Sequence, residues 1–437
     1  MEKSRFAHAI CVRESKFAVF NSILFQPIVM TENEKINLFN GDFSSFSDDD
    51  VEELLNVGIL VSSKEVDQIV LKNLKTYVEN NVGEDVSILY LISTSICNLS
   101  CKYCTLTENF SEVRKESMSV KTIENSINKF ADHLRKNKKK KGSIVFYGGE
   151  PTLNFSSIEK VCEISEGFKD LEFKIIVVTN AVKISDKQIA FFKDRGVIVG
   201  VSLDGPKEIN DKNRVLNSSE LGSYNIVISN LERLKKAGVK LSLSITLSHS
   251  FLDNEGILDW IISLGVPGIG YNLLRYNNKN DEWKGYYEKV SEFLFTSHEK
   301  LSDAGIREGR ILRKINAFYD EKKFKFNDCA AVGGGQLSIK PNGDVIVCQS
   351  VWSKAKEICG NINQNTFEDI FASDLYREWR GNLTVNKKEC LECSAISICG
   401  GGCPEQSEVL FGGRLKVDKT FCIHSKHSLE KLLKEAF

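Results

Sequence analysis

Hydrophobic and polar positions alternate in a regular way between about residues 86 and 276. Six short apolar runs, SILYLIS, GSIVFYG, FKIIVVTN, VIVGVSLDG, KLSLSITLS and GIGYNLLR, are separated by helical stretches such as SVKTIENSINKFADHLRK and GSYNIVISNLERLKKAG. Parallel strands need long crossover connections, so this alternation predicts parallel strands joined by helices. Six strands suit a partial (β/α)6 TIM-like barrel, an α/β fold whose active site lies at the carboxyl ends of the strands.

The first 85 residues have a different pattern. FAHAICV, KFAVFNS and ILFQPIVM are short, partly alternating runs typical of a small antiparallel sheet, and SDDDVEELLNVGILVS and SKEVDQIVLKNLKTYVENNVG have helical spacing. These elements predict a winged-helix-like α+β binding module over residues 1–85. The alternative is an N-terminal addition that only packs on the catalytic domain.

The composition of the remaining sequence indicates two further segments. Residues 277–328 are mixed and mostly helical, and they bridge to a cysteine-rich region at 329–437. A net charge of -1 argues against a protein that wraps nucleic acid. The N-terminus lacks an apolar signal region, and no apolar run reaches the ~18 residues that span a bilayer. We therefore expect a cytoplasmic protein without nucleic-acid or membrane partners.

A tight group of cysteines follows the first parallel strand. Cys97, Cys101 and Cys104 have the spacing C-x3-C-x2-C. In a reducing cytoplasm such groups are more often metal ligands or redox groups than disulfides. A structural zinc commonly takes four ligands from two C-x2-4-C pairs. Three thiolates on one loop fit a [4Fe–4S] cluster better, and its fourth iron is then open to a small molecule.

Two motifs together resemble the radical S-adenosylmethionine (SAM) superfamily. The cysteine triplet contains an aromatic residue, Tyr103, before its last cysteine, and the second strand ends in YGGEP at 147–151, which resembles the GGE motif of that family. The resemblance implies that Gly148, Gly149 and Glu150 bind the methionine part of SAM. Glycines there let the backbone approach a ligand closely, because they have no Cβ.

Further candidates lie at later strand ends. Ser202 and Asp204 in SLDGP, together with Arg214, resemble positions that contact the SAM carboxylate and ribose in relatives, although ordinary strand-end turn formers would look the same. VTNA at 178–181 replaces the TNG-like turn of the family, so Asn180 receives little weight.

The C-terminal cysteines resemble the SPASM domain of radical SAM enzymes that modify peptides and proteins. Seven thiolates exceed the need of one structural zinc, which is the competing interpretation. The resemblance implies two auxiliary [4Fe–4S] clusters, an outer one held by Cys390, Cys393, Cys399 and Cys422 and an inner one held by Cys329, Cys348 and Cys403. The inner set is one cysteine short of the fullest pattern. Either an iron stays open or Cys359 completes the set, and a buried thiol is the other interpretation of Cys359. We expect Cys11 and Cys162 to pack in the core.

These resemblances imply a radical SAM oxidoreductase that matures peptides. The deoxyadenosyl radical would take a hydrogen atom from a ribosomally made precursor peptide, and an oxidative crosslink, a thioether or a carbon–carbon bond, would follow. The N-terminal module would bind the leader of that peptide as an added strand. An external electron donor such as flavodoxin or ferredoxin is implied as a partner. The alternatives are an anaerobic sulfatase-maturating enzyme that forms formylglycine, and a non-catalytic iron–sulfur or zinc protein. The sequence identifies neither the catalytic base nor the peptide.

Overall fold

The computed structural model describes residues 1–81, 83–104, 115–219, 221–275, 283–320 and 324–437. Its N-terminal part consists of the strands β1 (Glu2–Lys3), β2 (Ala7–Arg13), β3 (Lys16–Asn21), β4 (Ile28–Thr31) and β5 (Leu60–Val61) and the helices α1 (Glu32–Asn40), α2 (Asp48–Asn56) and α3 (Lys64–Asn81). The three predicted strands are confirmed as the sheet β2-β3-β4, and both predicted helices are present. Helix α1 is an addition to the prediction, although its Thr31–Glu34 capping box is visible in the sequence.

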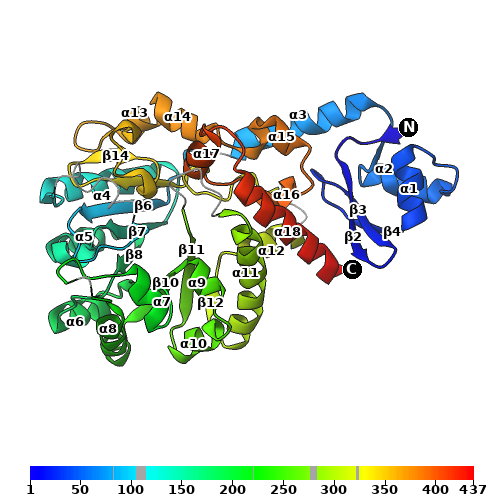
Figure 1. The fold of residues 1–437 in the computed structure, drawn as a ribbon. Coiled ribbons are helices and arrows are strands. Elements are labelled where there is room, and N and C mark those ends of the chain that lie inside the picture. Colours follow the sequence, from blue (N-terminus) through cyan, green and yellow to red (C-terminus); the bar gives the residue numbers. More distant parts are fainter. Residues whose placement is uncertain (82, 105–114, 220, 276–282, 321–323) are drawn as a thin grey trace.

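The N-terminal module has its own small core. This core is formed by Ala7, Val19, Met30, Leu38, Leu54, Ile59 and Leu60. The start of α3 is tied to the first strands, because the Ser4 hydroxyl donates to the Asp67 carboxylate at 2.6 Å and the Arg5 N–H donates to it at 2.8 Å. Figure 1 shows the module in blue beside the C-terminal helix α18 (Lys419–Ala436), which contacts β2. One edge of the three-stranded sheet is therefore turned toward the rest of the protein.

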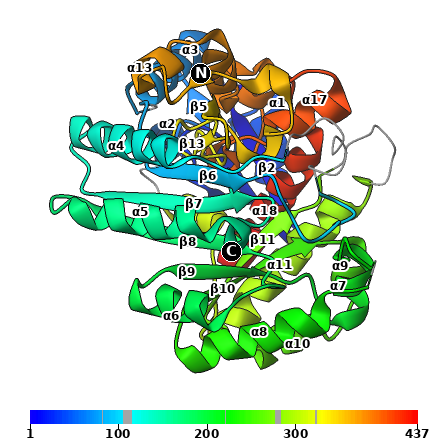
Figure 2. The same cartoon turned by 90° about the vertical axis from the view of Figure 1, so that its left-hand side faces the viewer.

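The central part is a parallel sheet with helices outside it. The strands are β6 (Ile88–Thr94), β7 (Lys141–Gly148), β8 (Glu172–Thr179), β9 (Ile198–Ser202), β10 (Lys240–Leu247), β11 (Gly268–Leu273) and β12 (Arg307–Glu308). The α-helices between β6 and β11 are α4 (Val120–Lys136), α5 (Phe155–Gly167), α6 (Asp186–Asp194), α7 (Lys207–Asn213), α8 (Tyr224–Ala237), α9 (His249–Leu252) and α10 (Ile257–Ser263). Figure 2 shows β6 to β10 side by side, with α5, α6 and α8 along their outer side. The six predicted strands are confirmed, and the short β12 extends the sheet.

Side-chain alternation explains why these strands form one sheet with two different faces. Leu89, Leu91, Ile144 and Phe146 are fully buried in the core that includes helix α4. Successive side chains of a strand point to opposite faces, so Tyr90 and Tyr147 lie on the other face. Apolar side chains of α4 recur with helical spacing, at Ile123, Ile127, Phe130 and Leu134, and Ser119 caps the helix start.

The cysteine-rich region continues the same sheet. Strand β13 (Gln336–Ile339) pairs in parallel with β6, and β14 (Asp344–Ile346) and β15 (Gly360–Asn361) follow in antiparallel order. Strands β13 and β14 form a hairpin that turns at Asn342–Gly343, with Gly343 at a φ of 89°. Sequence patterns did not predict that this hairpin would join the barrel sheet and bring its cysteine next to the first parallel strand.

The remaining elements are mostly helical. The bridging segment contains α11 (Tyr286–Asp303) and α12 (Leu312–Tyr319), while its residues 277–282 and 321–323 lie outside the described part. Beyond β15 are α13 (Phe367–Phe371), α14 (Asp374–Arg380), α15 (Lys388–Leu391), α16 (Ile396–Cys399), α17 (Pro404–Phe411) and α18. Within the described ranges, no helix combines the length and apolar character needed to cross a membrane.

Candidate active site and cysteine groups

The predicted site residues gather at the carboxyl ends of the parallel strands. The first cysteine loop follows β6, Gly148 ends β7, and Asn180 follows β8. Ser202 ends β9, and Asp204 lies two residues beyond it. The strands lie next to one another in the sheet, so these residues share one edge.

The first three cysteines form a group on a loop that is held from outside. Burial raises the pKa of Cys97 to about 12, the Leu99 N–H opposes this rise, and Glu150, Cys101 and Cys104 add to it. The Ser100 N–H donates to the Val215 carbonyl at 2.9 Å, and the Lys102 N–H donates to the Asn213 carbonyl at 3.0 Å. A second segment of the chain therefore fixes the loop. Three crowded thiols suit metal ligation once a bound cation lowers their pKa and stabilises the thiolates.

The two glycines of YGGEP allow the strand end to lie against the start of the cysteine loop. A Cβ on Gly149 would lie 2.3 Å from the Ile96 carbonyl oxygen, and one on Gly148, whose φ is 126°, would lie 2.8 Å from the Thr94 carbonyl oxygen. The sequence argument assigned this close approach to a bound ligand. In the structure Gly149 lies against the Ile96 backbone, and Gly148 lies against the Thr94 backbone and the Ile92 side chain, so the glycines also position the loop. Their contact with SAM stays a prediction.

Gly149→Ala is therefore expected to destabilise the protein. The contact with Ile96 is to backbone, which cannot move as a flexible side chain can, and overpacking of this kind costs about 1–3 kcal/mol. The measurement is the denaturant midpoint of anaerobically reconstituted protein. Gly167→Ala is the matched control, because a Cβ at this position would meet nothing within 4 Å and the residue ends helix α5. Equal midpoints for the two variants would contradict this account of the motif.

Glu150 is buried and accepts four hydrogen bonds within the protein. Its Oε1 accepts from the Thr152 N–H, the Thr152 hydroxyl and the Thr179 hydroxyl at 3.0, 2.7 and 2.6 Å, and its Oε2 accepts from the Asn180 N–H at 2.7 Å. Burial raises its pKa, while the bonds from Thr179, Asn180 and Thr152 oppose the rise. The carboxylate thus ties the end of β7 to the end of β8. A role toward SAM stays a prediction, and Oε2, with a single donor, is the oxygen with room for it.

Asn180 has more contacts at the site than its sequence suggested. Its side-chain amide donates to the Asn98 side-chain carbonyl at 2.8 Å and lies 3.8 Å from the Cys97 sulfur. Its own backbone N–H bonds to Glu150. The departure of VTNA from the TNG-like turn gave Asn180 little weight, but its place directly after β8 was the available signal. Asn180 links the GGE strand end to the cysteine loop.

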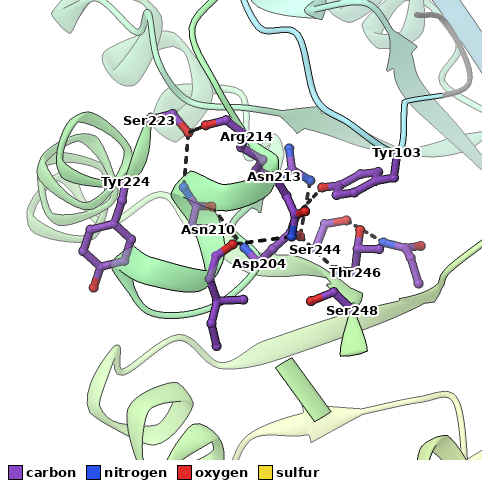
Figure 3. Close-up of polar contacts among 12 residues, drawn as sticks. Tyr103, Asp204, Asn210, Asn213, Arg214, Ser223, Tyr224, Ser244, Thr246 and Ser248 are labelled. Carbon is purple, nitrogen blue, oxygen red and sulfur yellow. Dashed lines mark hydrogen bonds and ion pairs between the residues drawn. The ribbon is translucent and has the colours of Figure 1, made fainter. Parts of the chain in front are cut away.

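Tyr103, Asp204 and Arg214 meet in one cluster (Figure 3), in which Asp204 and Arg214 are buried and Tyr103 is half-buried. The Tyr103 hydroxyl donates to Asp204, and the Arg214 Nε donates to the same carboxylate at 2.8 Å. The Thr246 N–H at the end of β10 also donates to Asp204, at 2.9 Å. Burial opposes the charge of Arg214, yet Asp204 and Tyr103 keep its pKa well above the ordinary value. Asp204 therefore joins the cysteine loop to β9 and β10.

Ser202 lies beside this cluster. It is 8% exposed, and it pairs with Ser244 across the β9–β10 ladder. Its predicted contact with SAM stays a prediction, as do those of Asp204 and Arg214.

The seven C-terminal cysteines separate into the two sets that the sequence suggested. Burial and then Cys348 and Cys403 raise the pKa of Cys329 to about 12. Burial and then Cys399, Cys393 and Cys390 raise the pKa of Cys422 to about 12. The structure therefore brings together Cys329, Cys348 and Cys403 in an inner group, and Cys390, Cys393, Cys399 and Cys422 in an outer group.

The other cysteines differ from these. Cys359 is buried, and burial raises its pKa to about 11. Glu357 adds to this rise, while Ser373 and Arg414 oppose it, and no other cysteine is among these groups. Cys162 is buried as predicted. The prediction for Cys11 is wrong: it lies exposed on β2, because its neighbours Ile10 and Val12 occupy the covered positions of that strand. None of the thirteen cysteines is in a disulfide. Within the described residues, no three Cys, His, Asp or Glu side chains converge as ligands of a single metal ion.

A parallel barrel edge with a three-cysteine loop and a glycine–glycine–glutamate strand end, followed by a cysteine-rich domain, defines an iron–sulfur enzyme that binds SAM. Comparison with known families agrees. The model of the Radical SAM superfamily matches residues 91–261, and the SPASM model, an iron–sulfur cluster-binding domain, matches residues 329–394. The chain is a radical SAM enzyme of the SPASM subfamily, and these domains imply [4Fe–4S] clusters.

Two relatives illustrate the range of the subfamily. The chain is 27% identical over 373 residues to the radical SAM cyclopropyl synthase TigE from Paramaledivibacter caminithermalis, and the match covers 80% of this chain and 75% of TigE. It is 24% identical over 368 residues to a cysteine-type anaerobic sulfatase-maturating enzyme from Clostridium novyi, and that match covers 80% of this chain and 95% of that protein.

Solved structures share the fold. The structure of anSMEcpe with bound AdoMet has a TM-score of 0.67 and 20% identity, and covers 80% of this chain and 95% of that chain. The structure of Streptococcus suis SuiB bound to precursor peptide SuiA has a TM-score of 0.57 and 16% identity, and covers 96% of this chain and 99% of that chain.

Proposed function

We propose that this enzyme oxidatively crosslinks a ribosomally made precursor peptide, through a thioether or a carbon–carbon bond. The observation that carries the proposal is the N-terminal module with one free sheet edge. Strand β4 pairs only with β3 in the described structure, whereas β2, at the other edge, is in contact with α18. An unpaired edge is a template for an added strand, and main-chain hydrogen bonds then give affinity without demanding much sequence. A leader peptide along β4 would use this edge.

The extent of the structural matches supports a peptide substrate with a leader. SuiB, whose structure is known with a precursor peptide, matches 96% of this chain, and anSMEcpe matches 80%. The match to SuiB is therefore long enough to include the N-terminal module of this chain. The name of TigE, a cyclopropyl synthase, supports carbon–carbon bond formation in this proposal.

We propose residues 1–85 as the recognition module, 86–276 as the radical SAM barrel, 277–328 as the bridge and 329–437 as the SPASM domain. The proposed ligands of the SAM-binding cluster are Cys97, Cys101 and Cys104. The proposed auxiliary ligands are the outer and inner groups described above. The proposed SAM-site residues are Tyr103, Gly148, Gly149, Glu150, Ser202, Asp204 and Arg214.

The SAM-binding group and the strand that leads to the inner group meet at one small apolar cluster. Cys104 packs against Ile92, Ile346 and Trp352, and Ile346 belongs to the strand that leads to Cys348. When bound, the cluster at the first group supplies the electron that cleaves SAM to methionine and a 5′-deoxyadenosyl radical. The substrate C–H bond gives its hydrogen atom to that radical. Bond formation would then release one proton to solvent and one electron. Cys329, Cys348 and Cys403 would hold a cluster that could accept this electron.

The leader prediction is tested with a precursor peptide from a small open reading frame beside the gene. Removing the leader is expected to slow modification by at least about tenfold, because the tethered core then loses its effective concentration at the active site. The measurement is the rate at which reconstituted, reduced enzyme with SAM lowers the peptide mass by two hydrogen atoms. A precursor with a scrambled leader controls for length.

A matched pair of enzyme variants places the effect on β4. Val29→Asp puts a charge on this edge strand, at a side chain that is 38% exposed, and is expected to slow the full precursor. Val120→Asp changes a 56% exposed side chain on α4 and is expected to leave the rate unchanged. Equal rates with and without the leader would contradict leader recognition. Formylglycine formation in the Cp18Cys peptide, which anSMEcpe binds in its structure, would favour sulfatase maturation instead.

A further inference from the structure

Tyr147 is the first residue of the YGGEP motif. It lies next to the end of β7, directly before Gly148. Its neighbours on the strand are buried, with Val145 at 7% and Phe146 at 0% exposure, whereas Tyr147 is 37% exposed. A large aromatic side chain at a strand end beside the cysteine loop, partly exposed although protein surrounds most of it, can contact a molecule that enters the site.

The register of the sheet fixes the surroundings of Tyr147. Ile92 of β6 is its direct partner across the ladder, and Tyr90 is the diagonal one on the same face. The rings of Tyr90 and Tyr147 lie edge to face, with centroids 6.3 Å apart and an interplanar angle of 88°. Edge-to-face packing is a favoured geometry of aromatic pairs and holds the Tyr147 ring in place.

Two cysteine groups flank this aromatic pair. Cys104 of the SAM-binding loop packs against the small apolar cluster that contains Ile92, the cross-strand partner of Tyr147. On the other side, β13 pairs with β6 at Tyr90, and Cys348 of the inner group follows the adjoining strand β14. Charge effects agree with this placement: burial raises the pKa of Tyr147, and Cys104 and Cys348 both add to the rise, while Arg275 and Arg214 oppose it.

We propose that Tyr147 contacts the substrate peptide and holds its reacting residue between the SAM-binding group and the inner cysteine group. The proposal rests on the peptide-modifying function above. The ring offers an apolar face for the side chain that loses hydrogen, and the hydroxyl can donate to a backbone carbonyl of the peptide. Tyr90 supports the ring from the side of the inner group.

This position matters because hydrogen-atom transfer needs close approach. Reacting atoms must come within about 3–3.5 Å, and a misplacement of about 1 Å can cost a factor of about 100 in rate. A substrate that is poorly held lets the radical react without product. Loss of the Tyr147 contact should therefore raise the number of SAM molecules cleaved per peptide modified, with SAM cleavage itself retained.

The test compares Tyr147→Phe, Tyr147→Ala and the control Tyr319→Phe, which changes a 62% exposed tyrosine on α12. Two quantities are measured on holoenzyme of equal iron content. One is the ratio of 5′-deoxyadenosine to modified precursor. The other is the dissociation constant of a fluorescent core-only peptide from unreduced enzyme with SAM, because a peptide without the leader shows contacts at the active site alone.

We expect Tyr147→Ala to raise the ratio by about tenfold or more. Tyr147→Phe should weaken core-peptide binding about three- to tenfold, the equivalent of one hydrogen bond, and Tyr319→Phe should change neither quantity. The proposed substrate contact of Tyr147 would be overturned if Tyr147→Phe kept wild-type values of both quantities and Tyr147→Ala kept the wild-type ratio. That outcome would leave the proposed peptide crosslinking function intact. If Tyr147→Ala loses iron, Tyr147→Phe decides alone. Wild-type enzyme that cleaves SAM but modifies no precursor would overturn the function and this inference together.

Discussion

Replacing Cys97, Cys101 and Cys104 together by alanine is expected to remove about four of about twelve irons per chain and to abolish 5′-deoxyadenosine formation. The three thiols form one group beside Glu150, and the other seven candidate ligands form two separate groups. Loss of the first group should therefore leave the auxiliary clusters bound. The measurement is anaerobic iron and sulfide quantification after reconstitution, with SAM cleavage followed under reductant.

Two single variants serve as controls for the iron count. Cys162→Ala changes a buried thiol of helix α5 outside all three groups, so it should keep about twelve irons. Cys359→Ala should also keep them, because the groups acting on Cys359 are Ser373, Glu357 and Arg414. A loss of iron in Cys359→Ala would make this residue the missing inner ligand. A wild-type content of about four irons, with zinc elsewhere, would contradict the auxiliary clusters and the oxidative crosslink with them.

The parallel strands were predictable from sequence because each one carries its own signal. An apolar run of strand length followed by a helix with spaced apolar positions can be recognised without knowing what lies elsewhere in the chain. Strands β6 to β11 all have this form. The cysteine groups were predictable for a related reason. Within each motif the spacing is local, and the C-x3-C-x2-C loop and GGE strand end are specific together.

Pairing between distant parts of the chain was not predictable. Strand β13 has four residues, and nothing in them indicates that they lie beside β6, which comes much earlier in the chain. The two-residue β12 has no pattern at all. Cys11 was misplaced for a similar reason: the side of β2 that is covered depends on what packs against it, and alternation alone leaves that choice open.

The partners of the site residues also required the structure. Tyr103, Asp204 and Arg214 come from the cysteine loop, the end of β9 and the end of α7, and only the sheet order brings them together. Sequence placed each of them near SAM by resemblance. It did not show that Asp204 binds both of the others, or that Glu150 is held by Thr152, Thr179 and Asn180.

Asp204→Asn is expected to lower the free energy of unfolding by about 3–5 kcal/mol, because it leaves the Arg214 guanidinium buried without its counter-charge. The side chains of Arg214 and Asp204 are 11% and 0% exposed, so solvent cannot replace the lost carboxylate. Glu172→Gln is the matched control. It breaks an ion pair with Lys141 whose side chains are 69% and 76% exposed, and such pairs contribute less than about 1 kcal/mol. Denaturant unfolding of reconstituted protein measures both.

The same variant separates the two roles that the sequence left open for Asp204. In the first role, the carboxylate links the cysteine loop to β9 and β10 through its hydrogen bonds with Tyr103, Arg214 and Thr246. Stability and SAM cleavage should then fall together in Asp204→Asn. The double variant Asp204→Asn/Arg214→Gln removes the unpaired charge, and it should recover part of the lost stability. If SAM cleavage recovers with it, the pair acts by positioning the loop. If stability returns while SAM binding stays lost, the carboxylate or guanidinium contacts SAM itself. If Asp204→Asn were as stable as Glu172→Gln, the buried ion pair would not be a stabilising element of this site.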